Sequence, residues 1–276
     1  MTDESAFLDP LQGCHPGVRG GWVGRLPGVP ITGGRDAAMQ TLRPYHEAAV
    51  AAFLANPVNP VDLGDAGIRQ EEAAGRMPAP RGPGILPGAS FQTTQSARST
   101  GLGISPQQWW RAEQVHGSSV ACVPYAPQIL APDGLSVVPG VDGLVTNQPG
   151  LVLAIYVADC AAIWLADRAS GAIGLLHSGK QGTVGGILEN ALALMAQAFG
   201  TRPGDVIAVL SPCIRPPDYE VDFAAHIAGQ AARAGLGGYY DSGANTAADI
   251  SRFYSYRIEK GQTGRMMALA VRDCPP

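Results

Sequence analysis

Charged residues are scarce in this chain of 276 residues, and neither sign gathers into a block. They make up 15% of the sequence, and the formal net charge is −4. The sequence contains no cluster of about five to eight lysines and arginines of the kind that binds nucleic acid. We therefore expect neither nucleic acid nor an anionic membrane surface as a partner.

Long apolar segments are also missing. No run approaches the roughly 18 apolar residues that a membrane helix requires. The first ten residues, M-T-D-E-S-A-F-L-D-P, are acidic and lack the apolar centre of a secretory signal. These absences predict a cytoplasmic protein, either a monomer or a small homo-oligomer, whose 46% hydrophobic residues supply an ordinary globular core.

Cysteine is sparse and unpaired in pattern. The five cysteines are widely spaced, and no C-x-x-C pair occurs. An odd number without such pairs argues against a disulfide framework and against a structural zinc knuckle. We expect reduced thiols at all five positions, which are Cys14, Cys122, Cys160, Cys213 and Cys274.

The middle of the chain predicts a β-hairpin. Three short apolar runs follow one another, L-V-L-A-I-Y-V at 151–157, A-A-I-W-L-A at 161–166 and A-I-G-L-L at 172–176. Each is typical of a buried strand. The D-R-A-S-G segment between the last two contains turn-forming residues, so these two runs are expected to pair antiparallel.

The register of this hairpin brings a cysteine to a histidine. If Asp167 pairs with Ala172, then Ala162 lies opposite His177, and Cys160 projects from the same face. Diagonal neighbours on one face have Cα atoms roughly 7 to 8 Å apart, which two side chains can span around a shared ion. A slip of one residue would place them on opposite faces. Two imidazoles and one thiolate form a catalytic zinc site with an open fourth position, and the second histidine remains to be found.

The rest of the chain predicts helices and strands around this hairpin, with one interruption. Residues 56–105 are rich in proline, glycine and polar residues, and we interpret them as a surface insertion within a single domain of residues 1–276, with a lid over the site as one use. The expected elements are a helix at 36–55 with a kink or restart at Pro44, a helix at 183–199 with its apolar face from Val184 to Ala198, a strand at 205–210, a helix at 223–234 and a strand at 266–271.

Five motifs share the order found in one family. They are Q-V-H-G-S-S-V, D-G-L-V-T-N-Q-P-G-L-V-L-A-I-Y-V-A-D-C, G-A-I-G-L-L-H-S-G, D-Y-E-V, and F-Y-S-Y-R followed by T-G-R-M. Residues 111–272 therefore resemble the laccase-domain, or polyphenol oxidase, family. That resemblance implies an α/β sandwich of mixed sheets flanked by helices, also seen in a cysteine-dependent toxin deamidase. It implies His116, Cys160 and His177 as the metal ligands, holding Zn²⁺ or, in its place, Cu²⁺.

The resemblance also implies an activity. Members of the family are described as purine nucleoside phosphorylases with adenosine deaminase activity, and some as peptidoglycan editing factors. The expected partners are a purine nucleoside and phosphate. A four-copper oxidase is excluded, because a blue-copper site and a trinuclear cluster together need more than the five histidines of this chain.

Two departures from the family pattern concern the site. The family's H-A-G-W-R-G is here H-S-G-K-Q-G, so the tryptophan and the arginine are absent. Lys180 supplies a positive charge, but it cannot form the two parallel hydrogen bonds to phosphate that an arginine can. The loop leads into a helix amino terminus that attracts anions, although capping by Thr183 explains it equally well. The family's Cys-Thr appears as Asn245-Thr246.

Roles follow for the remaining candidates. We expect Cys160, His177 and Asp159 to be catalytic, and Gln114, Lys180 and Arg257 to contact substrate. Asp159 either orients a ligand histidine or caps a turn. One carboxylate, Asp159 or Glu220, would transfer the proton. Further candidates carry the family pattern or an anion-binding charge, and they are Asp142, Tyr219 and Arg265.

Three hypotheses for function remain open at this point. The first is zinc-dependent phosphorolysis of adenosine or inosine, together with deamination of adenosine. The second is an amidohydrolase acting in peptidoglycan precursor editing, with Cys160 as nucleophile and His177 as its base. The third is a metal-binding module without catalysis, because the loop after His177 is changed.

Overall fold

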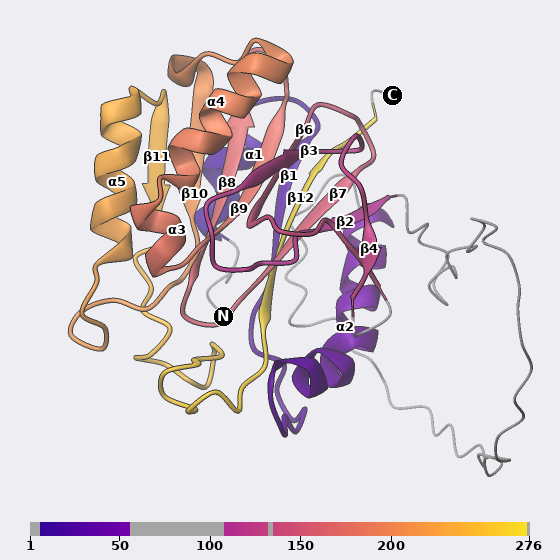
Figure 1. Ribbon diagram of the computed structural model, residues 1–276, viewed down its shortest axis with the longest axis vertical. Coiled ribbons are helices and arrows are strands. Elements are labelled where there is room, and N and C mark those ends of the chain that lie inside the picture. Colours follow the sequence, from indigo (N-terminus) through magenta and orange to yellow (C-terminus); the bar gives the residue numbers. More distant parts are fainter. Residues whose placement is uncertain (1–5, 56–107, 132–134, 275–276) are drawn as a thin grey trace, which may run out of the picture.

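Two β-sheets packed face to face form the centre of the molecule (Figure 1). The computed structural model describes residues 6–55, 108–131 and 135–274, so the expected insertion at 56–105 lies outside the described residues. The four-stranded sheet has the order β1 (Val18–Val23), β12 (Met266–Arg272), β7 (Val152–Val157), β2 (Trp109–Arg111). The six-stranded sheet has the order β11 (Gly238–Asp241), β10 (Val206–Leu210), β8 (Ala161–Asp167), β9 (Ile173–Ser178), β6 (Gly143–Thr146), β3 (Val120–Cys122).

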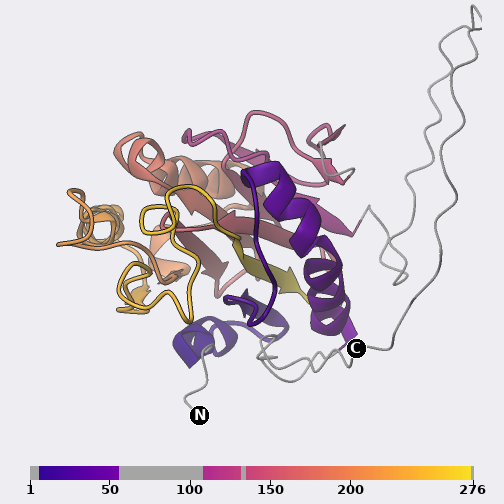
Figure 2. The same ribbon diagram turned by 90° about the horizontal axis from the view of Figure 1, so that it is seen from below.

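Helices cover the outer faces of both sheets. Figure 2 shows α2 on one side of the strands and α4 and α5 on the other. The described helices are α1 (Asp9–Gln12), α2 (Arg35–Ala55), α3 (Lys180–Val184), α4 (Ile187–Phe199) and α5 (Phe223–Ala234), with 3₁₀ turns at Ala6–Leu8 and Pro203–Asp205 and a small pair of strands, β4 (Ile129–Leu130) and β5 (Ser136–Val137). The expected α/β sandwich of mixed sheets flanked by helices is confirmed. Among the described residues, no helix combines the length and apolar character needed to cross a membrane.

Tryptophan joins the two sheets. Trp164 of β8 is fully buried between them, and its Nε1 donates a hydrogen bond of 2.7 Å to the carbonyl of Leu269 in β12. The rings of Trp22 and Phe7 meet it edge-on, with centroids 6.1 and 5.8 Å away. Because both faces of β8 are covered, its sequence is apolar from Ala161 to Ala166 rather than alternating.

The hairpin of β8 and β9 has the register that the sequence predicted. Ala162 lies opposite His177, and the amide of Asp167 donates to the carbonyl of Ala172 at 2.9 Å. The buried carboxylate of Asp167 accepts hydrogen bonds from the turn at Ala169 and Ser170. The turn is therefore stabilised from its own first residue, which fixes the register.

The helix expected at 183–199 is wrong at its start. α3 ends at Val184, and α4 begins only at Ile187, because Gly186 adopts a left-handed φ of 73°. A glycine pair favours such a break since it lacks side chains that stabilise a helix. Val184 and Ala198 are consequently exposed rather than on the buried face. Thr183 does not cap the helix; its hydroxyl is hydrogen-bonded to Ser178, and Gly179 is the N-cap.

The other predicted elements are confirmed within one or two residues. α2 runs as one helix from Arg35 through Pro44 to Ala55, so it does not restart at the proline. Its expected apolar face, from Met39 to Phe53, is buried against the four-stranded sheet. α5 has the predicted bounds, and the strands at 205–210 and 266–271 appear as β10 and β12.

Candidate metal centre

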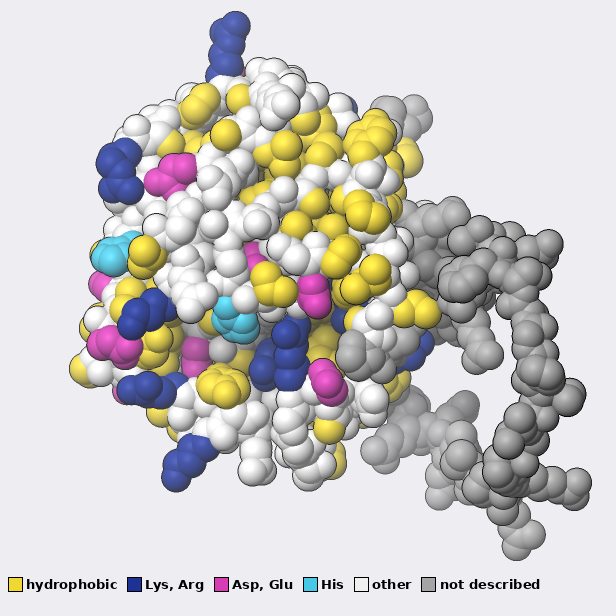
Figure 3. All heavy atoms as spheres, viewed as in Figure 1, with side chains coloured by type: hydrophobic (Ala, Val, Ile, Leu, Met, Phe, Trp, Pro, Cys, Tyr) yellow, Lys and Arg dark blue, Asp and Glu magenta, His cyan; other side chains and the backbone are white. Residues whose placement is uncertain are grey.

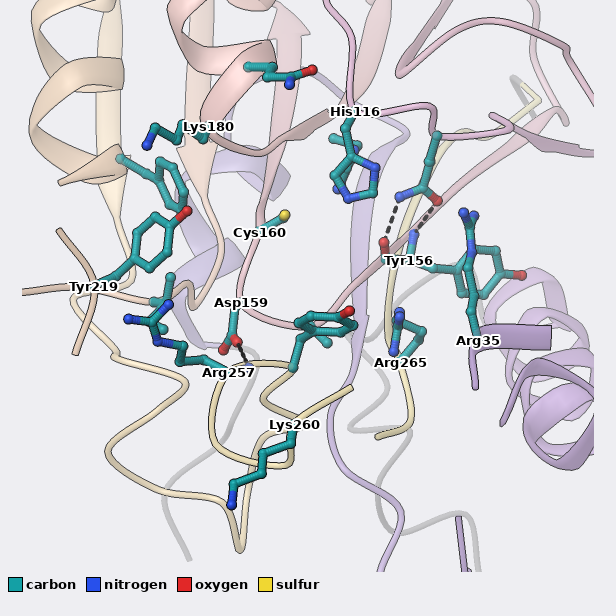
Figure 4. Close-up of a pocket in the computed structure, with 17 residues that line it drawn as sticks. Arg35, His116, Tyr156, Asp159, Cys160, Lys180, Tyr219, Arg257, Lys260 and Arg265 are labelled. Atoms are coloured by element: carbon teal, nitrogen blue, oxygen red, sulfur yellow. Dashed lines mark hydrogen bonds between the residues drawn. The ribbon is translucent and has the colours of Figure 1, made fainter. Parts of the chain in front are cut away.

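Three potential metal ligands converge from three separate segments. His116 lies in the loop after β2, Cys160 in the bend between β7 and β8, and His177 near the end of β9. Their ligand atoms all lie within 4.8 Å of one another. The two imidazole rings are nearly perpendicular, with centroids 5.0 Å apart (Figure 4). His116 is exposed and His177 is buried, so the cluster is open to a ligand on one side.

Asp142 holds both histidines. Its fully buried carboxylate lies 2.7 Å from Nδ1 of His177 and accepts hydrogen bonds from the amides of His116 and Gly117 at 2.9 and 2.7 Å. The bond to Nδ1 leaves Nε2 of His177 to bind a metal. His116 is held at a left-handed φ of 65°, a conformation that its anchored amide stabilises.

The electrostatics favour a thiolate in the protein without metal. Burial opposes ionisation of Cys160, but the charge of His177 and hydrogen bonds from His116 and His177 lower its pKa from 9.0 to about 6. Burial likewise opposes the charge of His177, yet the Cys160 thiolate and the hydrogen bond to Asp142 raise its pKa from 6.5 to about 9. The cluster is therefore a buried thiolate–imidazolium pair near neutral pH.

This donor set fits a zinc or copper ion. Zinc lies about 2.3 Å from thiolate sulfur and about 2.0 to 2.1 Å from imidazole nitrogen, so its tetrahedral ligands are separated by less than the 4.8 Å found here. The three residues line the cavity, and in catalytic zinc sites three protein ligands of these kinds leave a fourth position for water or substrate.

A cavity of about 760 Å³ opens over the cluster. It falls in the size range of small-molecule sites, roughly 300 to 1,000 Å³. Aromatic rings form part of its wall, namely Tyr156, Tyr219, Phe223 and Tyr256. Five cationic side chains also line it, Arg35, Lys180, Arg257, Lys260 and Arg265. In Figure 3 lysine and arginine side chains gather over the lower part of the face, whereas hydrophobic side chains cover much of its upper right.

Asp159 lines the cavity beside Cys160 but does not reach a histidine in its recorded contacts. Its carboxylate accepts hydrogen bonds from the Thr246 hydroxyl at 2.7 Å, the Ser255 hydroxyl at 3.1 Å and the Arg257 amide at 2.7 Å. The carboxylate that contacts Nδ1 of His177 is that of Asp142. Asp159 holds the loop that carries Arg257, and Thr246 of the Asn245-Thr246 departure is one of its donors.

Gln114 also lines the cavity, with its amide group turned to the backbone. Nε2 donates to the Tyr156 carbonyl at 2.6 Å, and Oε1 accepts from the Tyr156 amide at 2.9 Å. The side chain thus continues the edge of β7 in place of a strand (Figure 4). Its contact with Tyr156 fixes one aromatic wall of the cavity.

Lys180 and Arg257, the two cations expected to contact substrate, both line the cavity on one side (Figure 4). Lys180 forms a 3.4 Å ion pair with Glu220, and both side chains are more than half exposed. The Arg257 guanidinium carbon lies 5.6 Å from the centre of the Tyr219 ring. Arg257 therefore lies beside an aromatic side chain of the cavity wall, and Lys180 lies at its solvent-exposed edge.

The glycines of the H-S-G-K-Q-G loop, Gly179 and Gly182, lie too close to their neighbours to carry a side chain. A Cβ at this position would lie 2.9 Å from Sγ of Cys160 and 3.6 Å from the His116 ring. A Cβ at Gly182 would lie 2.7 Å from the carbonyl of Gly117. The two glycines let the loop pack directly on the ligand cluster, whatever residues stand between them.

Sequence reasoning missed several residues of the site. Arg35 and Lys260 line the cavity but lie outside the five motifs, and Tyr156 and Tyr256 lie within motifs whose pattern assigns them no role. Asp142 was noticed only as part of the family pattern. Its conspicuous signal was an acidic residue directly before a buried strand, which is equally typical of a turn.

The chain combines a two-sheet sandwich with a His–Cys–His cluster that could hold one metal ion, beside a cavity lined by cations and aromatic rings. The chain belongs to the family whose model is described as "Multi-copper polyphenol oxidoreductase laccase", which matches residues 90–233 and 221–273. All five histidines are described, and only His116 and His177 belong to the cluster. The chain therefore has too few histidines for the several copper sites that the family's name implies.

Two relatives are named as purine nucleoside phosphorylases. A protein of Geobacillus stearothermophilus named purine nucleoside phosphorylase YlmD is 31% identical over 62% of this chain and 74% of its own length. A purine nucleoside phosphorylase of Deinococcus radiodurans is 36% identical over 61% of this chain and 72% of its own.

Solved structures confirm the fold. The crystal structure of YlmD from Geobacillus stearothermophilus has a TM-score of 0.54 at 27% identity, covering 63% of this chain and 76% of that one. The hypothetical protein YfiH of Bacillus licheniformis has a TM-score of 0.55 at 23% identity, covering 62% and 76%, and this likeness shows the fold alone.

Proposed function

We propose that this protein is a zinc-dependent purine nucleoside phosphorylase that also deaminates adenosine. The observation that carries the proposal is the His116–Cys160–His177 cluster at the wall of a cavity lined by aromatic rings and cations. Aromatic rings suit a purine base, and cations suit phosphate. The names of the relatives support the phosphorylase part of the proposal.

The chain's own residues supply binding and orientation. Zinc held by the cluster would supply a Lewis acid that acidifies water or polarises a substrate oxygen. Tyr219 and Tyr256 face the space where a purine would stack, and Lys180 and Arg257 would hold phosphate. In phosphorolysis a phosphate oxygen bonds to C1′ of the ribose as the C1′–N9 bond breaks, and the purine leaves with a proton on its nitrogen.

We assign Asp159 to positioning rather than to proton transfer. Three hydrogen bonds occupy its two oxygens, and one of them comes from the amide of Arg257. A carboxylate that accepts three hydrogen bonds from one loop holds that loop in place. The proton step then falls to Glu220 beside Lys180, or to water.

Product analysis tests the proposal. The zinc-loaded protein is incubated with inosine and with adenosine, with and without phosphate. We expect ribose 1-phosphate and free base only when phosphate is present, and ammonia from adenosine in either case. A fully metallated sample that turns over neither nucleoside contradicts the proposal and favours the metal-binding module without catalysis.

The cytoplasm is the proposed location. Phosphorolysis requires free phosphate, and the five cysteines are free thiols. A reducing compartment would keep Cys160 available as a ligand.

A second candidate follows from the Cys160–His177–Asp142 chain of contacts. A thiolate beside an imidazolium that is oriented by a carboxylate is the arrangement of a cysteine hydrolase. The Cys160 sulfur would attack an amide carbon, His177 would donate its proton to the leaving amine, and water would release the acyl group. Peptidoglycan precursor editing is the setting that the family resemblance implies for such an enzyme.

A chelator separates the two candidates. Removal of metal should abolish phosphorolysis, whereas it should spare or raise an amidohydrolase, because zinc on the thiolate blocks its nucleophile. Amide hydrolysis that rises after chelation and is lost on alkylation of Cys160 would support the second candidate.

A further inference from the structure

Arg35 is the one cavity-lining residue that comes from outside the part of the chain matched by the family model. That match begins at residue 90, whereas Arg35 is the first residue of α2. Its Nη2 donates a 2.9 Å hydrogen bond to the carbonyl of Glu113 in the loop that leads to His116. This contact holds the guanidinium at the cavity.

Arg265 faces the same end of the cavity. It directly precedes β12, and its Nη1 donates to the carbonyls of Thr263 and Gly264 at 3.1 and 2.8 Å. No other hydrogen bond of this side chain is recorded among the described residues, so Nε and Nη2 remain for a ligand. Burial and the nearby charge of Arg35 lower the pKa of Arg265.

Among the described residues that line the cavity, no carboxylate forms an ion pair with Arg35 or Arg265, although the charge of Asp159 acts on Arg265. Asp159 is the one acidic residue that lines the described cavity, and its oxygens are taken by the loop at Thr246, Ser255 and Arg257. Two like charges at a partly buried site repel unless an anion lies between them. A guanidinium presents a planar fork of donors, so two of them match a phosphate group well.

The pair lies apart from the cations assigned to phosphate. Figure 4 shows Arg35 and Arg265 on the side of Tyr156, whereas Lys180, Arg257 and Tyr219 lie on the other side, with His116 and Cys160 between them. The cavity therefore offers two cationic ends and one metal centre. Inorganic phosphate and a neutral nucleoside together supply an anion for only one end.

We propose that Arg35 and Arg265 form a second anion subsite, which receives the 5′-phosphate of a purine nucleoside monophosphate. The inference rests on the proposed function, since it assumes that a purine ribose reacts at the metal centre. The substrate class then becomes purine nucleotides rather than nucleosides alone. The phosphorolysed product would be ribose 1,5-bisphosphate, with the 5′-phosphate unchanged by the reaction.

The test compares inosine 5′-monophosphate with inosine. For the zinc-loaded protein we expect a higher kcat/KM with the monophosphate. Arg35→Gln should lower the ratio of the two kcat/KM values by about 10 to 100-fold, the value of a charge-assisted hydrogen-bonded pair. Arg43→Gln is the matched control, because Arg43 lies two turns along the same helix and pairs with Glu47. It should leave the ratio unchanged.

Two outcomes overturn the inference. One is a ratio that Arg35→Gln leaves unchanged. The other is a rise in the KM for inorganic phosphate that equals the fall in the ratio, since Arg35 would then serve the co-substrate.

Binding separates this inference from the proposed function. If neither substrate is turned over, calorimetry with the zinc-loaded protein still measures the affinity for both ligands. Tighter binding of the monophosphate that Arg35→Gln removes means that the subsite stands while phosphorolysis fails. Equal affinities for the two ligands in the unsubstituted protein mean that the subsite itself fails.

Discussion

Asp142 determines how the metal centre is built at the scale of single residues. Its carboxylate contacts Nδ1 of His177 and the amides of His116 and Gly117, so one buried side chain orients two ligands. Carboxylates that orient metal-binding histidines fix the tautomer and raise the basicity of the ligand nitrogen. The metal affinity should therefore depend on a residue that does not touch the metal.

Asp142→Asn tests this dependence. We expect the affinity for zinc to fall by about 10 to 100-fold, because the amide keeps the shape but loses the charge. Competition with a chromophoric chelator measures it. Asp36→Asn, at an exposed site in the first turn of α2, is the control and should bind zinc normally. Equal affinities in both variants would contradict the assigned role.

The thiol of Cys160 should show its lowered pKa in the protein without metal. The reactive form is the thiolate, and its fraction rises with pH through about 6 rather than 9. We expect alkylation of Cys160 by iodoacetamide to be near its plateau at pH 7 and to fall as the pH drops below 6. Mass spectrometry of the modified peptide measures the rate.

Two comparisons make this result interpretable. Cys160→Ser removes the labelled peptide and confirms the assignment. His177→Asn removes the positive charge that stabilises the Cys160 thiolate, so the midpoint pH of alkylation should move upward. A midpoint near 9 in the unsubstituted protein would contradict the thiolate–imidazolium pair.

At the scale of elements, the hairpin of β8 and β9 was predictable and the site around it was only partly so. The hairpin is local, and its turn residues and apolar runs specify the register that places Ala162 opposite His177. Asp142 joins the site through the antiparallel pairing of β6 with β9, where Gly143 lies opposite Leu176. A pairing across more than thirty residues leaves no local pattern in the sequence, so its role could not be deduced.

His116 illustrates the same limit. Its loop follows β2, which pairs parallel with β7 so that Trp109 lies opposite Val152. Family resemblance proposed His116 as a ligand, but spacing alone offered no route to it. The break between α3 and α4 is a smaller example. The helical spacing of apolar residues continues across Gly185 and Gly186, although the helix itself is interrupted there.

The junction of β9 with α3 should be intolerant of any side chain at Gly179. Gly179→Ala would place a Cβ 2.9 Å from Sγ of Cys160, so the thiolate must move away from the other ligands. We expect zinc affinity to fall by roughly tenfold or more. Gly204→Ala is the control, because nothing lies within 4 Å of its added Cβ. Loss of affinity in both variants, or in neither, would contradict a specific steric effect.

At the scale of the whole molecule, the metal centre ties the two sheets together. Cys160 lies where β7 of the four-stranded sheet passes into β8 of the six-stranded sheet, and His177 lies on β9. An ion bound to both would stabilise the native arrangement over the unfolded chain. The effect should appear in thermal unfolding.

Zinc should therefore raise the Tm. At a free concentration about 1,000 times its Kd, binding stabilises by about 4 kcal/mol, which corresponds to roughly 8 to 16 °C for a chain of this size. Calorimetry of chelator-treated and zinc-loaded samples measures the shift. His116→Ala should abolish most of it, while the exposed His226→Ala should retain it. An equal shift in both variants would place the zinc elsewhere.

The central claim is that His116, Cys160 and His177 together hold one catalytic metal ion. Elemental analysis of the purified protein and its variants tests it most directly. We predict one zinc per chain in the unsubstituted protein and in His226→Ala, and well under half of that in His116→Ala, Cys160→Ser and His177→Ala. A full complement of zinc in any of these three ligand variants would contradict the claim.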